Sequence, residues 1–120
     1  DNYEGLKTAI ESLASQPTVI LHGGARGADQ LAEQYAKAQG IPTTIIKPDY
    51  QKHNYKAAPL ERNSELVQLA DATLALYGKG RDRKGGTWDA AKKTIAANKP
   101  LTERLSNGTL RTKTLTLQLF

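Results

Sequence analysis

Helix-like and strand-like patterns of apolar residues alternate along the chain. Apolar side chains recur at three- and four-residue intervals in separate segments, which predicts amphipathic helices over residues 3–14, 28–36, 60–69 and 88–96. Short apolar runs rich in β-branched residues lie between these segments and predict strands at residues 18–21, 43–46 and 72–77. The polar stretch of residues 47–59 shows no clear period, and we expect a loop there.

This alternation of helices and short strands is typical of parallel βαβ units joined by right-handed crossovers. We therefore expect an α/β protein, a three-layer α/β/α sandwich with helices on both faces of one mostly parallel sheet. A doubly wound domain normally begins with a strand, whereas this pattern opens on a helix. We accordingly expect that a leading strand is missing from this sequence.

The C-terminal residues differ in character from the rest of the chain. Ser106, Asn107 and Gly108 are a strong turn signal, and the leucines at 115, 117 and 119 then alternate with polar residues, as in a half-buried strand. This segment is expected to form a hairpin that covers the sheet edge, or a strand that pairs with a second subunit in a homo-oligomer. We expect one domain, with a main part over residues 1–104 and a C-terminal β extension over residues 105–120.

Composition limits the class of protein. The chain has 120 residues, the size of one domain, and contains no cysteine, which excludes disulfides and thiolate metal sites. No apolar run is long enough to span a membrane, and the first residues lack the basic and apolar regions of a signal peptide. We expect a cytoplasmic protein with no membrane partner. His22 and His53 are too far apart to form a metal motif, and no cofactor is expected.

The formal net charge of +5 at pH 7 suits an anionic ligand, either a small phosphate or a nucleic acid. A solvated basic surface would give the same charge, so the position of the basic residues matters more than their sum. Several of them stand in residues 79–84, directly before a Gly-Gly-Thr sequence.

A first glycine-rich loop follows the first predicted strand and contains Gly23, Gly24, Arg26 and Gly27. Glycine lets the backbone turn tightly and approach a ligand without a Cβ atom in the way. The helix after the loop would present free N–H groups and the positive end of its dipole to an anion, and Arg26 adds a guanidinium suited to phosphate. Ligands of open α/β sheets bind beyond the carboxyl ends of the strands, where this loop lies. A tight turn without a ligand would use the same glycines.

A second loop with Gly85, Gly86 and Thr87 occupies the same place after the third predicted strand. Thr87 could cap the following helix or donate its hydroxyl to a phosphate. Two such loops at neighbouring strand ends would border one cleft, which is a stronger signal than either loop alone.

Arg62 and Asn63 stand near the start of the third predicted helix. An arginine at a helix N-terminus opposes the helix dipole, so we expect Arg62 to reach an anion in the same cleft, with Asn63 beside it. The alternative is a surface pairing of Arg62 with Glu61 or Glu65. If the protein is an enzyme, Arg62 and Asp89 are the candidate catalytic residues.

Four segments of this chain resemble the SLOG superfamily of Rossmann-like proteins, and its YspA/YpsA-related branch of bacterial and phage proteins in particular. They read HGGARGADQLAEQYAKAQGI, PLERNSEL, LADATLALYGKG and GGTWDAAKKTIAANKP. The resemblance covers about residues 1–100, and it implies a Rossmann-like fold that binds a nucleotide. In that family a strand with a Gly-Ser-Arg-type loop precedes the first helix.

Two other branches of the superfamily imply different activities. The lonely-guy phosphoribohydrolases use an arginine ahead of a helix, which Arg62 matches, and a glutamate three residues after the threonine of PGGxGTxxE. This chain has Ala90 there and a carboxylate one position earlier, at Asp89, which argues against that activity. The DNA-processing protein A family binds single-stranded DNA and shares a GxARGxD-like loop and an Arg-Asn pair, which Arg26 and Arg62 match. Only 6% of this chain is aromatic, so platforms for base stacking are few.

The leading hypothesis is a protein that binds a nucleotide or a nucleotide-derived phosphate between the two glycine loops. The first alternative is N-glycosidic cleavage of a nucleoside monophosphate, and the second is binding of single-stranded DNA. The sequence leaves the base, the sugar and the number of phosphates open.

Overall fold

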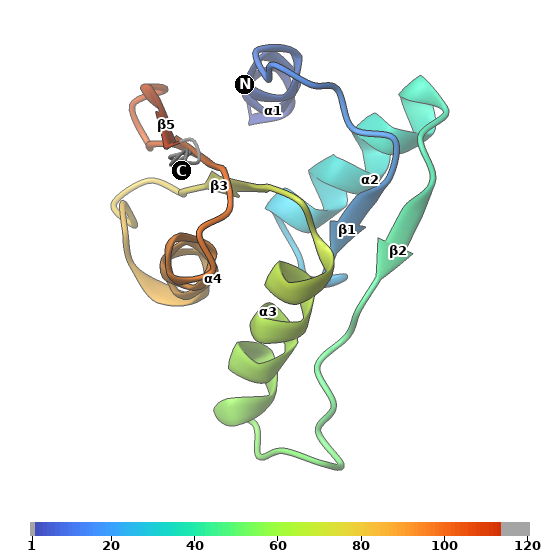
Figure 1. Ribbon diagram of the computed structural model, residues 1–120, viewed down its shortest axis with the longest axis vertical. Coiled ribbons are helices and arrows are strands. Elements are labelled where there is room, and N and C mark those ends of the chain that lie inside the picture. Colours follow the sequence, from blue (N-terminus) through green and yellow to red (C-terminus); the bar gives the residue numbers. More distant parts are fainter. Residues whose placement is uncertain (1, 114–120) are drawn as a thin grey trace, which may run out of the picture.

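The structure, a computed structural model, describes residues 2–113 and alternates helices with short strands (Figure 1). The elements in order are α1 (Asn2–Glu11), β1 (Ile20–His22), α2 (Ala28–Gln39), β2 (Thr43–Ile45), α3 (Ala57–Leu69), β3 (Thr73–Leu76), α4 (Gly85–Ala96), β4 (Leu101–Arg104) and β5 (Leu110–Lys113). The α/β class expected from the sequence pattern is confirmed.

The strands form two sheets rather than the single sheet expected. β1 pairs in parallel with β2, and Ile20 lies opposite Thr43. β3 pairs in parallel with β4, and β4 pairs antiparallel with β5 in a hairpin. Within residues 2–113 no ladder joins β1 to β3, so each of these strands has one unpaired edge. The strand expected ahead of the first helix would precede Asp1, and it stays a prediction.

Helices pack in pairs on this framework. α1 contacts α2 and β3, while α3 contacts α4, which in turn lies against β3 and β4. One core cluster is centred on Leu6, Ile10 and Tyr35, and a second is centred on residues of β3, α4 and β4, including Ala91 and Leu101. Figure 1 shows β1 and β2 beside α2, with α4 and β5 on the other side of β3. None of the helices described is long and apolar enough to cross a membrane.

The structure corrects the bounds of one expected loop, adds a strand and confirms one expected turn. The loop expected over residues 47–59 ends earlier, because α3 begins at Ala57. β4 was not expected, and it follows directly after Pro100. The turn expected at Ser106 to Gly108 is present and joins β4 to β5, with the Leu105 N–H donating to the Thr109 carbonyl oxygen. The strand expected over Leu115 to Leu119 lies outside the residues that the structure describes.

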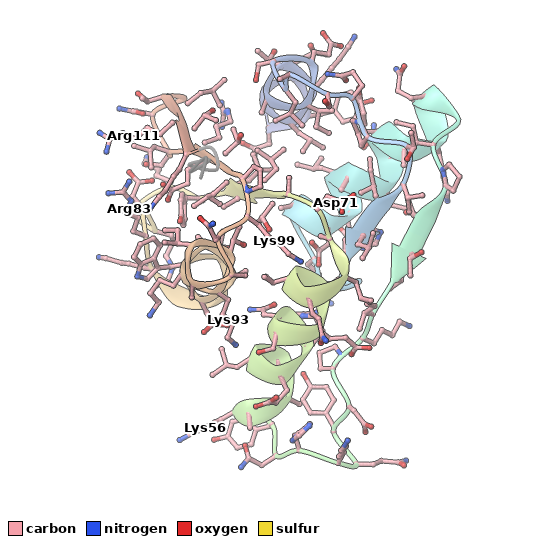
Figure 2. The ribbon with its side chains drawn as sticks, in the orientation of Figure 1. Lys56, Asp71, Arg83, Lys93, Lys99 and Arg111 are labelled. Atoms are coloured by element: carbon pink, nitrogen blue, oxygen red, sulfur yellow. The ribbon has the colours of Figure 1, made fainter. Side chains whose placement is uncertain are left out.

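Lys99 closes the C-terminus of α3. Its Nζ donates to the carbonyl oxygens of Val67 (2.6 Å), Gln68 (2.9 Å) and Ala70 (2.7 Å). α3 has no basic residue in its own last turn, so this ammonium from the segment after α4 supplies the positive charge that a helix C-terminus favours. Figure 2 shows Lys99 and Lys93 reaching from the α4 side toward α3.

We expect Lys99→Met to lower the free energy of unfolding by about 2 kcal/mol, because the last carbonyls of α3 lose a charged donor while the apolar stem remains. For a chain of this size the melting temperature should fall by roughly 8 °C, measured by circular dichroism. Lys79→Met is the matched control, since Lys79 is exposed and makes no interaction among the described residues. Equal melting temperatures for the two variants would contradict a stabilising role for Lys99.

Candidate functional site

Arg62 and Asn63 on α3 join the two glycine loops. The Arg62 guanidinium donates from Nη1 to the carbonyl oxygen of Gly23 (3.1 Å) and from Nε to Oδ1 of Asn63 (3.0 Å). Asn63 donates from Nδ2 to the carbonyl oxygen of Gly86 (3.0 Å) and is 6% exposed. A chain of hydrogen bonds therefore runs from the first loop through α3 to the second loop, and the structure brings together the segments that the sequence singled out.

The Arg62 side chain passes directly over the backbone of Gly23. A Cβ atom at position 23 would overlap the guanidinium, so a residue larger than glycine must displace Arg62. Gly24 and Gly27 have positive φ angles of 71° and 81°, a conformation that glycine adopts without strain. Glycine is thus favoured in this loop for two separate reasons. At Gly23 a side chain would collide with Arg62, and at Gly24 and Gly27 the backbone has a positive φ angle.

The first loop uses several of its own N–H groups internally. Oδ2 of Asp29 accepts hydrogen bonds from the N–H groups of Gly23 and Ala25, both at 3.1 Å. Nδ1 of His22 accepts the Gly24 N–H at 3.1 Å. The amides of Gly23 and Gly24, which we expected to be offered to a phosphate, therefore have partners within the protein. Asp29 acts as the acceptor that organises the loop.

His22 is fixed by the same network. Because Nδ1 accepts a hydrogen bond, Nε2 carries the proton and donates to Oε2 of Glu33 at 3.0 Å. The side chain of His22 is 6% exposed. Hydrogen bonds from His22 and Thr43 lower the pKa of the Glu33 carboxyl. His22 is thus a buried structural residue at the end of β1.

The second loop leads into an uncapped helix. α4 begins at Gly85 without a side-chain cap, and Thr87 lies inside the first turn and does not cap it. The N–H groups of Gly85, Gly86 and Thr87 have no acceptor among residues 2–113. A Cβ atom on Gly85 would lie 2.6 Å from Nη2 of Arg81, so the Arg81 guanidinium packs against the start of the helix. Free N–H groups and an arginine are therefore close together here.

Asp89 faces α3 rather than open solvent. Its Oδ2 accepts a hydrogen bond from Nδ2 of Asn63 (3.2 Å) and pairs with Nζ of Lys93 (2.9 Å). Nζ of Lys93 also donates to the carbonyl oxygen of Leu60 at 2.7 Å. These contacts give Asp89 a structural role in the packing of α4 on α3.

The reason given for Arg62 from the sequence is wrong. α3 begins at Ala57, and Oδ1 of Asn54 accepts the N–H groups of Lys56 and Ala57 at the start of the helix. Arg62 lies in the second turn and does not oppose the N-terminal end of the dipole. Its contact with Gly23 instead follows from the packing of α3 beside the end of β1. The glutamate pairing considered as an alternative is absent from the described residues.

A buried group that the sequence did not reveal holds the basic loop. Glu103 of β4 is 6% exposed, accepts the Tyr77 hydroxyl at 2.7 Å, and binds Arg83 through Nη2 (3.1 Å) and Nε (3.3 Å). Arg83 has a φ of 53°, and its guanidinium lies 5.8 Å from the centre of the Trp88 ring. The loop that carries Arg81 is therefore fastened to β4.

Charge and burial act in opposite directions on this group. Burial raises the pKa of Glu103, but hydrogen bonds from Arg83 and Tyr77 and the charge of Arg83 lower it by more, so the net pKa is lowered. Burial and the Glu103 carboxylate raise the pKa of Tyr77. The hydrogen bond to Glu103 raises the pKa of Arg83. Glu103 is thus an ionised carboxylate at neutral pH, with Arg83 as its counter-charge.

Arg26 differs from the other arginines of the site. It is exposed and makes no hydrogen bond or ion pair among the described residues. The Gly27 N–H likewise has no acceptor there. No group of histidine and acidic side chains in residues 2–113 has the arrangement of a metal site. Within the part of the chain that the structure describes, the first loop therefore offers the free guanidinium of Arg26 and the free N–H groups of Arg26 and Gly27.

Comparison with known proteins gives a partial family match. The model of the YAcAr family, described as the YspA, cpYpsA-related SLOG family, matches residues 4–53. Over this segment the chain is similar to that family. The matched segment includes most of α1, the first glycine loop and α2, whereas Arg62 and the second loop lie beyond it.

One curated relative is similar to part of this chain. The Gene 61 protein of Mycobacterium phage D29 is 41% identical over 63 residues, which are 48% of this chain and 50% of the relative. The match thus spans half the length of that relative. No solved structure matches the chain.

Proposed function

We propose that this protein binds the phosphate of a nucleotide-type ligand at the N-terminus of α4. The observation that carries the proposal is the set of free N–H groups of Gly85, Gly86 and Thr87 under the Arg81 guanidinium. An uncapped helix start with an arginine beside it suits a phosphate, because the amides, the helix dipole and the guanidinium all favour negative charge. The similarity of residues 4–53 to the SLOG family also favours a nucleotide-related ligand.

The first loop forms the other wall of this site in the proposal. Arg26 and the Gly27 N–H are available to a ligand, whereas Gly23 and Gly24 shape the loop and let Arg62 approach. Arg62 and Asn63 hold the two loops at a fixed spacing and are positioning residues. We do not assign catalysis to Asp89, because its Oδ2 is already held by Asn63 and Lys93.

Isothermal titration calorimetry with ADP tests this proposal. We expect wild-type protein to bind ADP and Arg81→Ala to bind it about tenfold more weakly, since a charge-assisted contact at an exposed site is lost. Arg111→Ala is the matched control, because Arg111 carries the same charge on exposed β5 and should bind ADP as the wild type does. Inorganic phosphate should compete with ADP. No binding of ADP, or equal affinities of the Arg81 and Arg111 variants, would refute the site.

A further inference from the structure

The segment between β2 and α3 exposes aromatic side chains. Tyr50 is 59% exposed and Tyr55 is 73% exposed, whereas Tyr35 and Tyr77 are 4% and 5% exposed in the core clusters. A tyrosine normally buries its ring and keeps its hydroxyl in contact with water. Two largely exposed rings in one short segment therefore indicate a surface that binds another molecule. The chain contains few aromatic residues, and this segment presents two of its five tyrosines to solvent.

Local hydrogen bonds give the segment a defined shape. Oδ1 of Asp49 accepts the N–H groups of Gln51 (3.0 Å) and Lys52 (3.1 Å), and Asn54 caps the start of α3. Both polar side chains are thereby occupied in turns. Tyr50 and Tyr55 lie in these turns, and their rings are accessible to a ligand.

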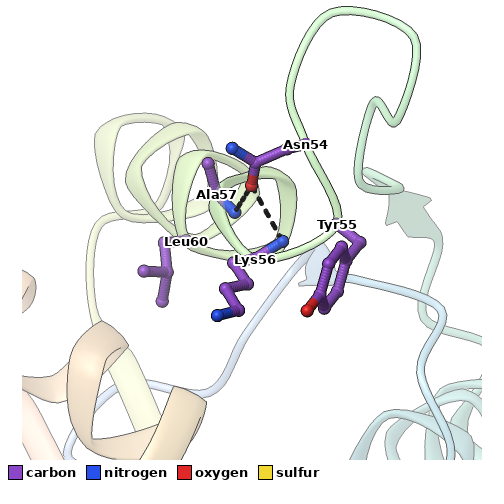
Figure 3. A pocket seen from close by; sticks show the side chains of 5 residues that line it. All are labelled: Asn54, Tyr55, Lys56, Ala57 and Leu60. Atoms are coloured by element: carbon purple, nitrogen blue, oxygen red, sulfur yellow. Dashed lines mark hydrogen bonds between the residues drawn. The ribbon is translucent and has the colours of Figure 1, made fainter.

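An open depression lies beside Tyr55. Asn54, Tyr55, Lys56, Ala57 and Leu60 line it, and Figure 3 shows Tyr55 and Leu60 on either side of Lys56. Leu60 is itself 42% exposed. The depression thus combines a π-face, an aliphatic side chain and a cation.

The charge of the segment is positive. Positions 47 to 60 contain three lysines and one acidic residue: Lys47, Lys52, Lys56 and Asp49. The Asp49 carboxylate accepts a hydrogen bond within a turn. Nζ of Lys56 lies 5.8 Å from the centre of the Tyr55 ring. Lys47 also lies against the first glycine loop, since its Cε is 3.7 Å from the position of a Cβ atom on Gly24. Basic residues therefore extend from the first glycine loop to the exposed tyrosines.

We propose that Tyr50, Tyr55 and the depression beside Tyr55 form a stacking platform for the bases of single-stranded nucleic acid. Exposed aromatic rings with flanking lysines match the two needs of such a ligand, a π-surface for unpaired bases and positive charge for the backbone. A duplex would bind less well because its bases are already stacked. The platform is separate from α4, so its failure would leave the proposed phosphate site intact.

Fluorescence anisotropy with a labelled oligothymidylate of about twelve nucleotides, within the usual range of site sizes, tests the platform. We expect Tyr55→Ala to weaken binding at least about tenfold, and Tyr55→Phe to retain it because the ring remains. Tyr50→Ala should weaken binding in the same direction. Affinity should fall with salt, and Lys52→Ala should reduce the slope of that dependence. The same variants, titrated with ADP, should match the wild type.

The outcomes separate the two proposals. Loss of oligothymidylate binding in Tyr55→Ala, with ADP binding unchanged, supports the platform. Wild-type protein that does not bind the oligonucleotide, or a Tyr55→Ala variant that binds it as the wild type does, overturns the platform even if ADP still binds. Equal affinity for the oligonucleotide and for its duplex overturns it as well, because stacking on the tyrosines requires unpaired bases.

Discussion

Asn63→Asp should lower the free energy of unfolding by about 3 kcal/mol, and the melting temperature by roughly 12 °C. The change keeps the size of the side chain but removes both N–H donors of a buried amide. The new oxygen would face the Gly86 carbonyl and the Asp89 carboxylate, which are both acceptors. Buried like charges and unpaired acceptors are both unfavourable, so the two effects add. Thermal unfolding followed by circular dichroism measures the loss.

The matched control is Asn107→Asp. Asn107 is exposed, and its Oδ1 accepts the Thr109 N–H, a bond that a carboxylate also makes. That variant should unfold close to the wild-type temperature. The deficit of Asn63→Asp should shrink as the pH falls, since burial and Asp89 raise the pKa of the introduced carboxyl above its unfolded value and protonation relieves the repulsion. A small loss of stability in Asn63→Asp, or a loss that grows as the pH falls, would contradict the hydrogen bonds of Asn63 to Gly86 and Asp89.

Glu103→Leu should lower the free energy of unfolding by about 3 kcal/mol. The substitution leaves the buried Tyr77 hydroxyl without its acceptor and removes the carboxylate that binds Arg83. The Arg83 side chain is 45% exposed, so solvent screens its ion pair with Glu103 and the loss of that pair contributes little. Most of the loss in free energy of unfolding therefore comes from the unpaired Tyr77 hydroxyl and the altered packing. Glu65→Leu on the exposed surface of α3 is the control and should have little effect.

The stability due to Glu103 should depend on pH in one direction. Because its pKa is lowered in the folded protein, its contribution is present above the ordinary glutamate pKa of about 4.3 and is lost as the pH falls through the folded value. Glu103→Gln, which keeps an acceptor for Tyr77, should therefore differ most from wild type at neutral pH and converge with it as the pH falls through the lowered pKa of Glu103. Chemical denaturation across this range measures the difference. A difference in free energy of unfolding between Glu103→Gln and the wild type that widens as the pH falls would refute the ion pair of Glu103 with Arg83.

The sequence pattern was sufficient for the elements with clear periodicity. The helical stripes and β-branched runs predicted four helices and three strands, because each of those segments shows a regular apolar period or a short β-branched run in the sequence. A hairpin around Ser106 to Gly108 was one of the two alternatives expected for the C-terminal segment, but its strands were not placed. Leu101, Thr102 and Glu103 show no alternation although all three are buried. Glu103 is tolerated there only because Tyr77 and Arg83 lie beside it, which a linear pattern does not reveal.

The candidate site was predicted in its parts but not in its connections. Glycine spacing identified both loops, and the pair Arg62 and Asn63 was correctly associated with them, although for the wrong reason. The use of Gly23 and Gly24 amides by Asp29 and His22 was missed, because it depends on where side chains point after the chain folds. An acidic residue two positions after Gly27 was the available signal for Asp29. Arg81 could not be separated by sequence from its basic neighbours.

The most direct test is a two-dimensional ¹H–¹⁵N nuclear magnetic resonance titration of the protein with ADP. We expect saturable shifts that are largest for the backbone amides of Gly85, Gly86 and Thr87, with smaller shifts at Gly27. The amides of Gly23 and Gly24 should move little, since their N–H groups are already bonded within the loop. Largest shifts at Gly23 and Gly24, or none at the start of α4, would contradict the phosphate site proposed here.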